Sequence, residues 1–201
     1  MTDDRLARQL AFLVEADKLK SVNRRTPLVD ASRLENSAEH SWHLVLAALV
    51  LREHTTEPFD LVHVLELLAV HDLVEIDAGD TFAYDASAHH DKAAREQAAA
   101  ARIFGLLPAD QASYFRELWV EFEAQQSIEA RFANALDRFQ ALLLNANAGG
   151  GSWRTHEVTR AAVLRRMAPI EATLPSVWTV VTEIIESFSA AGVLRRERSE
   201  Q

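Results

Sequence analysis

The sequence predicts an all-α, single-domain fold of about eight helices, and three features lead to this prediction. The 201 residues include only six glycines and five prolines, so few residues interrupt regular structure. An all-β fold needs many turns, which these counts do not favour. Apolar residues make up 48% and charged residues 25%, as in an ordinary globular domain. No internal repeat or linker divides the chain, so we expect one domain over residues 1–201.

The expected helices follow from apolar residues that recur at helical spacing between short loops. Asn36 and Asp60 are residue types that begin helices, and Glu39 completes a capping-box pattern with Asn36. Gly79 tolerates the left-handed geometry that ends a helix. The predicted helices cover residues 4–20, 36–54, 60–78, 89–105, 109–125, 128–147, 155–168 and 175–191.

The remaining segments are expected to be irregular. Residues 22–35 read as a polar loop, and residues 194–201 as a frayed tail. We place the core that bears the candidate site at about residues 36–145, with C-terminal helices at 155–191.

Charge and composition narrow the function. The net charge of −9 argues against binding to a nucleic-acid polymer, which needs a basic surface. The chain has no cysteine, so a metal would have to bind histidine, aspartate, glutamate or backbone oxygen. The first 20 residues contain acids and no continuous apolar core, and no stretch approaches a membrane span. We therefore expect a cytoplasmic location and no membrane partner.

The segments 36–54 and 60–78 are apolar nearly all round, which is typical of helices at the centre of a bundle. Polar residues inside such helices need a reason. If the two helices form an antiparallel hairpin, His40 lies only two or three residues from the register of His71 and Asp72. That offset is roughly 3–5 Å along the axis. We therefore expect His40 to approach the His71–Asp72 pair.

A fourth candidate ligand comes from the helix 128–147. Asp137 lies on its apolar face, where a carboxylate is costly unless it is paired with an arginine or binds a metal. Two imidazoles and two carboxylates suit Mn, Co, Fe, Ni or Zn and are tolerable for Mg, with Mn or Co favoured. The sequence therefore predicts one divalent metal ion, held by His40, His71, Asp72 and Asp137.

Glu75 shares one helical face with His71 and Asp72, because it follows them by four and three residues. A carboxylate one turn from a metal site is a candidate general acid or base. Each of these residues alone would be an ordinary helical side chain. Their convergence on apolar helices favours a site. The other histidines are interpreted as structural or solvated: His43, His54, His63, His89, His90 and His156.

Three segments together resemble a known family. ENSAEHSWH, AVHDLVEIDAGD and NALDRFQALL contain the H…HD…D pattern of the HD-domain superfamily of metal-dependent phosphohydrolases. The resemblance is strongest to the HD-domain 5′-deoxynucleotidases, which remove phosphate from deoxyribonucleoside 5′-monophosphates. It extends from LKSVNR near the start of the chain to the helix that bears Asp137. It implies the four metal ligands named above, a small nucleotide substrate and a homodimer.

The resemblance also implies roles for further residues. Glu75 would be the catalytic carboxylate and would exchange protons together with Asp72. Arg24, in LKSVNR, would hold the phosphate, since arginine is a planar and permanently charged donor. Asp80 would face the sugar hydroxyl and help select deoxyribose, with Asp77 nearby.

Two positions depart from the nucleotidase pattern. Arg25 stands where these enzymes have a tryptophan, and TFAYD replaces a sequence that contains proline. Both lie where the nucleoside would be recognised. A hydrolase of another phosphomonoester or of a phosphodiester is therefore the second interpretation. A dinuclear phosphodiesterase would need extra histidines, for which His63 is a candidate.

Of two further interpretations, a sensing module stays open and a di-iron bundle is set aside. A non-catalytic, nucleotide-sensing HD module is the third interpretation, although the intact ligand set with Glu75 and Arg24 argues against it. A carboxylate-bridged di-iron bundle needs paired Glu-x-x-His motifs. These motifs do not occur at the central positions, so we set this class aside.

Overall fold

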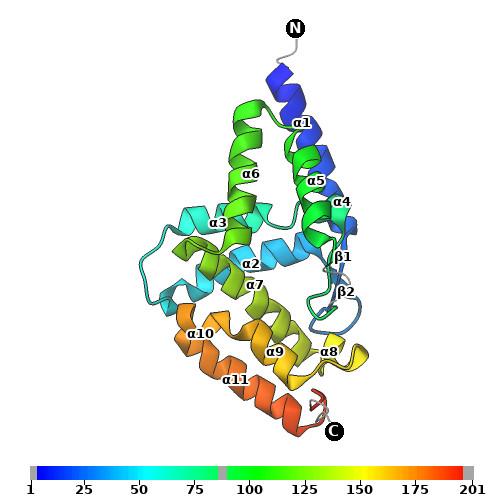
Figure 1. Cartoon of the computed structure of the whole chain (residues 1–201), viewed down its shortest axis with the longest axis vertical. Coiled ribbons are helices and arrows are strands. Elements are labelled where there is room, and N and C mark those ends of the chain that lie inside the picture. Colours follow the sequence, from blue (N-terminus) through cyan, green and yellow to red (C-terminus); the bar gives the residue numbers. More distant parts are fainter. Residues whose placement is uncertain (1–3, 86–89, 197–201) are drawn as a thin grey trace.

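The computed structural model describes residues 4–85 and 90–196, and these residues are mostly helical (Figure 1). The predicted all-α class and the single HD-type domain are confirmed. The described helices are α1 Asp4–Ala16, α2 Ser37–Leu51, α3 Leu61–Val70, α4 Glu75–Ala78, α5 Lys92–Phe104, α6 Ala109–Ala124, α7 Ile128–Asn147, α8 Gly151–Thr155, α9 Arg160–Met167, α10 Pro169–Thr173 and α11 Pro175–Ala190.

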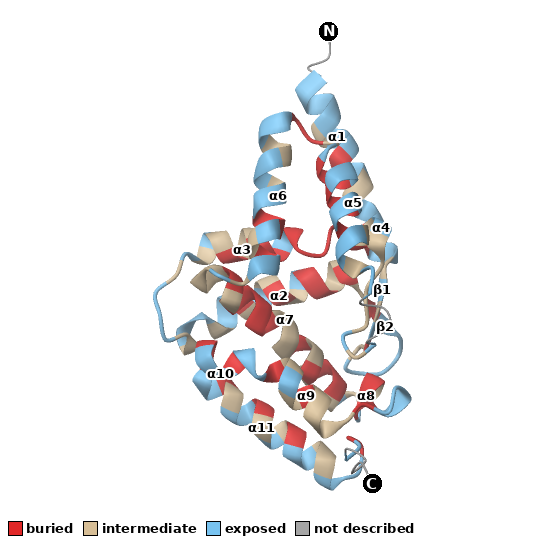
Figure 2. Cartoon of the chain, viewed as in Figure 1, coloured by how far each residue is buried: buried red, intermediate tan, exposed pale blue. Residues whose placement is uncertain are grey.

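The long helices surround a core made by α2, α3 and α7. In Figure 1, α1, α5 and α6 run side by side at the N-terminal end, and α8 to α11 cover the C-terminal end. Leu44 of α2, Leu67 of α3 and Leu136 of α7 are fully buried. Figure 2 shows the buried positions gathered where these helices cross. The apolar runs thus place the polar candidate residues at the centre of the molecule.

The predicted helix caps are confirmed. The Asn36 side chain accepts a hydrogen bond from the Glu39 backbone, and the Glu39 side chain accepts one from Asn36, which completes the capping box of α2. Asp60 caps α3 through a 2.9 Å bond from the Val62 backbone N–H. Gly79 ends α4 with φ of 73°, a conformation that L-residues rarely adopt.

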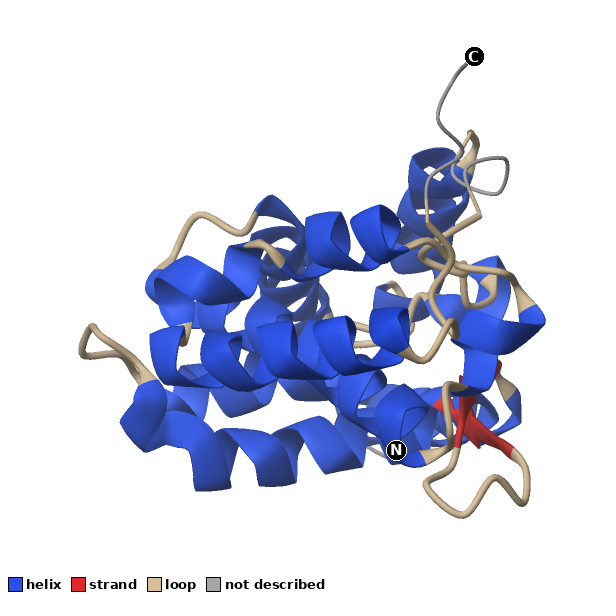
Figure 3. Cartoon of the chain, turned by 90° about the horizontal axis from the view of Figure 1, so that it is seen from below, coloured by secondary structure: helices blue, strands red, loops and turns tan. Residues whose placement is uncertain are grey.

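The segment predicted to be a polar loop contains a β-hairpin. Strands β1 (Asn23–Pro27) and β2 (Leu34–Asn36) pair antiparallel, and Ala31 takes a positive φ of 56° in the turn. The strands lack alternating apolar residues, so the period-2 signal was absent from the sequence. Figure 3 shows the hairpin at one edge of the helical body. The hairpin is important because it positions Arg24.

The predicted helix 60–78 is divided in two. It continues as α3 only to Val70, and the chain then makes a tighter turn before α4 begins at Glu75. Within this turn the Leu73 N–H bonds to Val70 O at 3.1 Å, and the Glu75 N–H bonds to Asp72 O at 2.9 Å. These are i to i−3 bonds, which wind the chain more tightly than an α-helix.

Two smaller boundaries also differ from prediction. The α-helical part of the first helix ends at Ala16 and continues as a 3₁₀ turn, as does α2 after Leu51. The segment expected as one helix over 155–168 is instead the end of α8, a loop and α9. A Cβ at Gly151 would lie 2.7 Å from Pro27 Cγ, so only glycine allows β1 to approach here.

The tail is ordered further than expected. Leu194 is 1% exposed, and the Arg195 N–H donates to Val158 O at 3.0 Å. The prediction that the chain frays from residue 194 is therefore wrong at these two positions. The reason is that the Leu194 side chain is buried as part of the hydrophobic core. Residues 86–89 and 197–201, where a helix start and the rest of the tail were expected, lie outside the described residues. Within the described part, no helix is both long and apolar enough to cross a membrane.

Candidate metal centre

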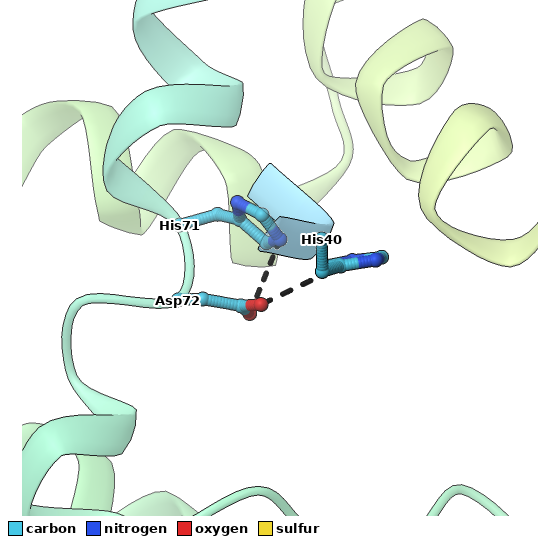
Figure 4. A group of neighbouring side chains, drawn as sticks. All are labelled: His40, His71 and Asp72. Carbon is cyan, nitrogen blue, oxygen red and sulfur yellow. Dashed lines mark ion pairs between the residues drawn. The ribbon is translucent and has the colours of Figure 1, made fainter. Parts of the chain in front are cut away.

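Three of the predicted ligands converge in a buried group (Figure 4). His40 comes from α2, and His71 and Asp72 come from the tight turn after α3. One ligand atom from each lies within 4.8 Å of the others. His71 Nε2 lies 3.1 Å from Asp72 Oδ1, and His40 Nε2 lies 3.9 Å from Asp72 Oδ2. The helical-hairpin register therefore does bring His40 to the His71–Asp72 pair.

Asp137 reaches the same point from α7. Its Oδ1 lies 3.0 Å from His40 Nε2, and its side chain is 14% exposed. Burial opposes the charge of this carboxylate. The hydrogen bond with His40 and the charges of Arg166 and Arg24 outweigh burial and hold the pKa of Asp137 well below its usual range. The structure thus brings together all four residues predicted as ligands.

Both imidazoles are held in the tautomer that a metal requires. His40 Nδ1 lies 3.0 Å from Gln140 Oε1, and His71 Nδ1 lies 2.9 Å from Leu68 O. Since both partners are acceptors, each Nδ1 donates, and in the neutral ring the lone pair is on Nε2. Nε2 of both rings faces the centre, and His71 Nε2 is buried without a hydrogen-bond partner. This donor set fits a divalent cation.

The neighbouring carboxylates also favour a proton on His71. Burial disfavours a charged His71, but the Asp72 carboxylate raises the pKa of His71 to about 9. Burial likewise opposes the Asp72 charge, but His71 and Arg24 lower the pKa of Asp72 to about 2. A metal ligand must be deprotonated, so a bound cation would take the place of the His71 proton.

Buried polar residues that the sequence did not indicate support the centre. The Gln140 amide donates to Glu35 Oε1 at 2.7 Å, which fixes the amide so that its oxygen faces His40. Gln140 and Glu35 are each 2% exposed. Gln140 follows Asp137 by three residues on the same helical face, a spacing that could have revealed it. Glu35 lies on β2 and became recognisable only through the fold.

Glu75 begins α4 beside the centre. It is 9% exposed, and Ser37 Oγ donates to its Oε2 at 2.6 Å. Burial and the charge of Asp72 raise the pKa of Glu75 well above its usual value. The protonated form of this carboxyl is therefore favoured more than in an exposed glutamate.

The hairpin brings Arg24 into the same group. Its Nη1 lies 3.1 Å from Asp72 Oδ2, its Nη2 lies 3.7 Å from Asp137 Oδ1, and Asp80 Oδ1 is 4.0 Å away. Burial opposes the charge, but these carboxylates outweigh it and raise the pKa of Arg24 above its usual value. Arg24 and Asp80, both predicted to contact substrate, therefore lie together at the centre.

Other predicted residues lie elsewhere. Asp77 faces Arg102 of α5, with Oδ1 2.7 Å from Nη2, and does not line the pocket described below. Its position gives no support to substrate contact, because residues two apart on a helix face different directions. His63 Nε2 lies 2.8 Å from Glu121 of α6 and is not part of the buried group. His43 Nδ1 lies 3.1 Å from Gln140 Nε2, and its structural role stays a prediction.

A pocket of about 180 Å³ opens over the centre. Arg25 and the TFAYD segment line it, so both departures from the nucleotidase pattern do lie at the pocket. Apart from the central residues, its walls include Phe82, Tyr84, Lys92, Arg138, Trp153 and Arg166.

The fold and this centre define the class: a helical domain with a buried histidine–aspartate group that could hold a metal. The sequence model of the protein family described as HD domain matches residues 16–178 of this chain. The chain belongs to the HD domain family, and its predicted membership of the superfamily of metal-dependent phosphohydrolases is confirmed.

Relatives agree with this assignment. The human protein 5′-deoxynucleotidase HDDC2 is 31% identical over 135 residues, which are 67% of this chain and 65% of that protein. The chain thus spans slightly less than two thirds of the length of that human protein. A protein described as a predicted metal-dependent phosphohydrolase from Magnetospirillum magnetotacticum MS-1 is 47% identical, with a TM-score of 0.90 over 95% of this chain and 96% of that one. A conserved hypothetical protein from Pyrococcus furiosus, 21% identical with a TM-score of 0.62 over 90% of this chain and 99% of that one, shares the fold.

Proposed function

We propose that this chain is a metal-dependent 5′-deoxynucleotidase, which hydrolyses deoxyribonucleoside 5′-monophosphates to nucleoside and phosphate. The observation that supports this most is the buried group of His40, His71 and Asp72, with both Nε2 atoms directed at one point beside Glu75. The likeness to a protein named as a 5′-deoxynucleotidase supports the substrate class. Asp137 would complete the ligand set for one divalent ion, for which Mn or Co is favoured.

The residues around the centre have complementary tasks in this reaction. A bound divalent cation would polarise the phosphoryl group and lower the pKa of water. As the water oxygen bonds to phosphorus, the water gives up a proton, the bond from phosphorus to O5′ breaks, and the departing O5′ takes up a proton. Glu75, whose Oε2 accepts a hydrogen bond from Ser37, is placed to exchange protons in this step. The charge of the nearby Asp72 raises the pKa of Glu75 and so takes part in setting this exchange. Arg24 would balance charge on the phosphoryl oxygens.

Asp80 is the proposed contact for the sugar. Its carboxylate lies in the pocket beside Arg24 and can accept a hydrogen bond from the 3′-hydroxyl of the sugar. We expect the carboxylate to hold this hydroxyl so closely that a 2′-hydroxyl is excluded, which would favour deoxyribose over ribose. Base preference would depend on Arg25 and the TFAYD segment, which face the same space.

The test is phosphate release from a panel of deoxy- and ribonucleoside 5′-monophosphates with Mn²⁺, Co²⁺ or Mg²⁺, or with a chelator. Release from deoxynucleotides that is lost with chelator is the expected result. Release only from other phosphomonoesters or from phosphodiesters would overturn the substrate class. Metal and nucleotide binding without release from any ester would instead identify a sensor.

A further inference from the structure

Two arginines form the wall of the pocket next to Asp137. Arg138 belongs to α7 and Arg166 to α9, and both line the pocket. Arg166 Nη2 lies 3.2 Å from Asp137 Oδ2, whereas Asp137 Oδ1 faces His40. Arg166 therefore adjoins the candidate metal ligand on the side away from His40. Its side chain is 37% exposed, so it remains accessible from the pocket.

Arg138 is a partly buried cation for which residues 4–85 and 90–196 provide no carboxylate at ion-pair distance. Its Nη2 donates to Gln125 Oε1 at 3.1 Å, and its Nη1 lies 3.5 Å from the backbone oxygen of Arg166. Among the ion pairs within 4.0 Å in the described part of the chain, none involves Arg138. Its Nε is buried without a hydrogen-bond partner. Guanidinium groups that lose water are usually paired with anions, so this side chain has unused binding capacity.

The two guanidinium groups also repel each other. Arg138 Nη1 lies 3.5 Å from the backbone oxygen of Arg166, and both side chains line the same pocket, so two positive charges are held close together. Asp137 cannot neutralise both arginines, because it already faces His40 and Arg24. A metal cation on Asp137 would add further positive charge beside the pair. Like charges held together in a partly buried wall are stabilised when an anion binds between them.

Arg24 provides a contrast within the same pocket. Asp72, Asp137 and Asp80 lie within 4.0 Å of its guanidinium, so its charge is already compensated by the protein. Among the described residues that line the pocket, Arg138 forms no ion pair, and Arg166 shares Asp137 with His40 and Arg24, so the protein compensates the charge of this wall only in part. The exposed Arg25 also lines the pocket, but it does not adjoin Asp137 in any ion pair. An anionic ligand would be attracted to this wall more than to Arg24 alone.

We propose that Arg138 and Arg166 form an anion-binding pair that holds a phosphate group of the ligand next to the metal centre. This inference rests on the proposed function only in that the pocket admits a phosphate ester. Two guanidinium forks match the oxygens of a phosphate and bind them with charge-assisted hydrogen bonds. The phosphate is either the one to be cleaved or a second phosphate of the same ligand, and substrates with one and two phosphates distinguish these sources.

The test is calorimetric titration of inorganic phosphate into the full chain with saturating Mn²⁺. Arg166→Gln and Arg138→Gln are compared with Arg165→Gln, which removes the same charge from an exposed neighbouring position. We expect the dissociation constant for phosphate to rise about tenfold or more in the first two variants, and less than twofold in the control. Metal content is measured in every variant, because Arg166 contacts Asp137.

Equal dissociation constants in all variants, or an equal loss in Arg165→Gln, would overturn the pair. Arg138 also contacts the end of α6 through Gln125, so its loss could unfold the chain. Arg138→Lys keeps a cation there but lacks the guanidinium fork, and we expect its dissociation constant for phosphate to lie between those of the wild type and Arg138→Gln at an unchanged melting temperature. A variant that keeps full phosphate affinity but melts earlier would show a structural role only, and would overturn the proposal.

Ligands with one and with two phosphates then show whether the pair holds the phosphate to be cleaved or a second phosphate. If the pair holds the phosphate to be cleaved, Arg166→Gln raises the KM for dAMP. If it holds a second phosphate, the KM for dAMP is unchanged, and binding of deoxyadenosine 3′,5′-bisphosphate weakens. Failure of the wild type to hydrolyse nucleotides, with phosphate affinity lost in the variants, would contradict the proposed function and uphold the pair. Full hydrolysis by the wild type, with unchanged phosphate affinity in the variants, would uphold the proposed function and contradict the anion-binding pair.

Discussion

Glu75 illustrates how position alone sets the behaviour of a side chain. It occupies the first position of a four-residue helix, is 9% exposed and accepts a hydrogen bond from Ser37. The neighbouring Asp77 has the same chemical group but lies outside the pocket, paired with Arg102. The two carboxylates therefore form a matched pair for testing which one takes part in the reaction.

We predict that Glu75→Gln keeps its metal and lowers turnover about 100-fold or more, because proton transfer by a positioned carboxyl contributes that much. Glutamine preserves the volume of the side chain and can still accept from Ser37. Asp77→Asn is the control, and its turnover should stay within about twofold of the wild type. Initial rates together with metal analysis check this prediction, and full turnover in Glu75→Gln would contradict it.

The metal ligands give a second prediction at this scale. His71→Ala and Asp72→Ala should abolish metal retention, because each removes one of the few donors directed at the centre. His63→Ala is the control, since His63 is on the same helical run but contacts Glu121. Metal content after gel filtration measures the outcome. A metal-loaded His71→Ala protein would rule out His71 as a ligand.

At the scale of the elements, the centre depends on how α2 begins. The Asn36–Glu39 capping box fixes the first turn of α2, and His40 follows in the next position. We predict that Asn36→Ala lowers the free energy of unfolding by about 1 kcal/mol, because it leaves backbone donors without a partner. Urea unfolding measures this. Metal affinity should fall as well, and an unchanged stability would show that the cap contributes nothing.

The contact between α3 and α6 adds a pH-dependent contribution. Burial opposes a charged His63, but its hydrogen bond with Glu121 raises the pKa of His63 overall. The stabilisation is therefore fully present below about pH 6.5, the unfolded value, and is lost as pH rises through the folded pKa. After screening by solvent, we expect His63→Gln to cost about 0.5 kcal/mol more at pH 5.5 than at pH 9.

Urea unfolding at both pH values checks this prediction. His90→Gln is the matched control, because His90 lies on an exposed segment before α5. His90→Gln should change the free energy of unfolding by the same small amount at both pH values. A larger loss for His63→Gln at pH 9 than at pH 5.5 would have the wrong sign for this contact.

At the scale of the whole molecule, the centre joins segments that are distant in sequence. His40, His71 and Asp137 come from α2, the end of α3 and α7 respectively, and β1 adds Arg24. Of these elements, α2, α3 and α7 also contribute buried apolar side chains to the core. A cation bound here would therefore cross-link the centre of the fold.

We predict that removal of metal by a chelator lowers the melting temperature by about 5–10 °C relative to protein at 100 times the dissociation constant in Mn²⁺. This follows from about 2.7 kcal/mol of binding linkage and the usual temperature shift for a chain of this size. Scanning calorimetry measures the shift. An equal shift in His71→Ala would show that the chelator acts elsewhere.

The homodimer stays a prediction at this scale. Apolar side chains on α1 and α2 are exposed in the single chain, and they would be available for such contact: Leu6, Leu10, Leu13, Val14, Trp42, Leu46, Leu49 and Val50. Light scattering of the purified protein measures the mass directly.

Local sequence determined where most helices lie, the caps of α2, α3 and α4, and the central pair of apolar segments, but not every helix boundary. Asn36, Asp60 and Gly79 act through their own backbone and nearest neighbours, so their effect is visible without the fold. The offset between His40 and His71 also follows from helical register alone. These features could be predicted because each depends on residues close in the chain or on one simple pairing.

Tertiary structure decided the parts that depend on contacts between distant segments. The polar strands of the hairpin have no period of their own, and only their pairing brings Arg24 to Asp72. Glu35, Gln140 and Arg166 are ordinary polar residues in the sequence, yet packing buries or aims them around the centre. The reason is physical: the energy of a buried charge depends on the groups that surround it in space, which local periodicity does not encode.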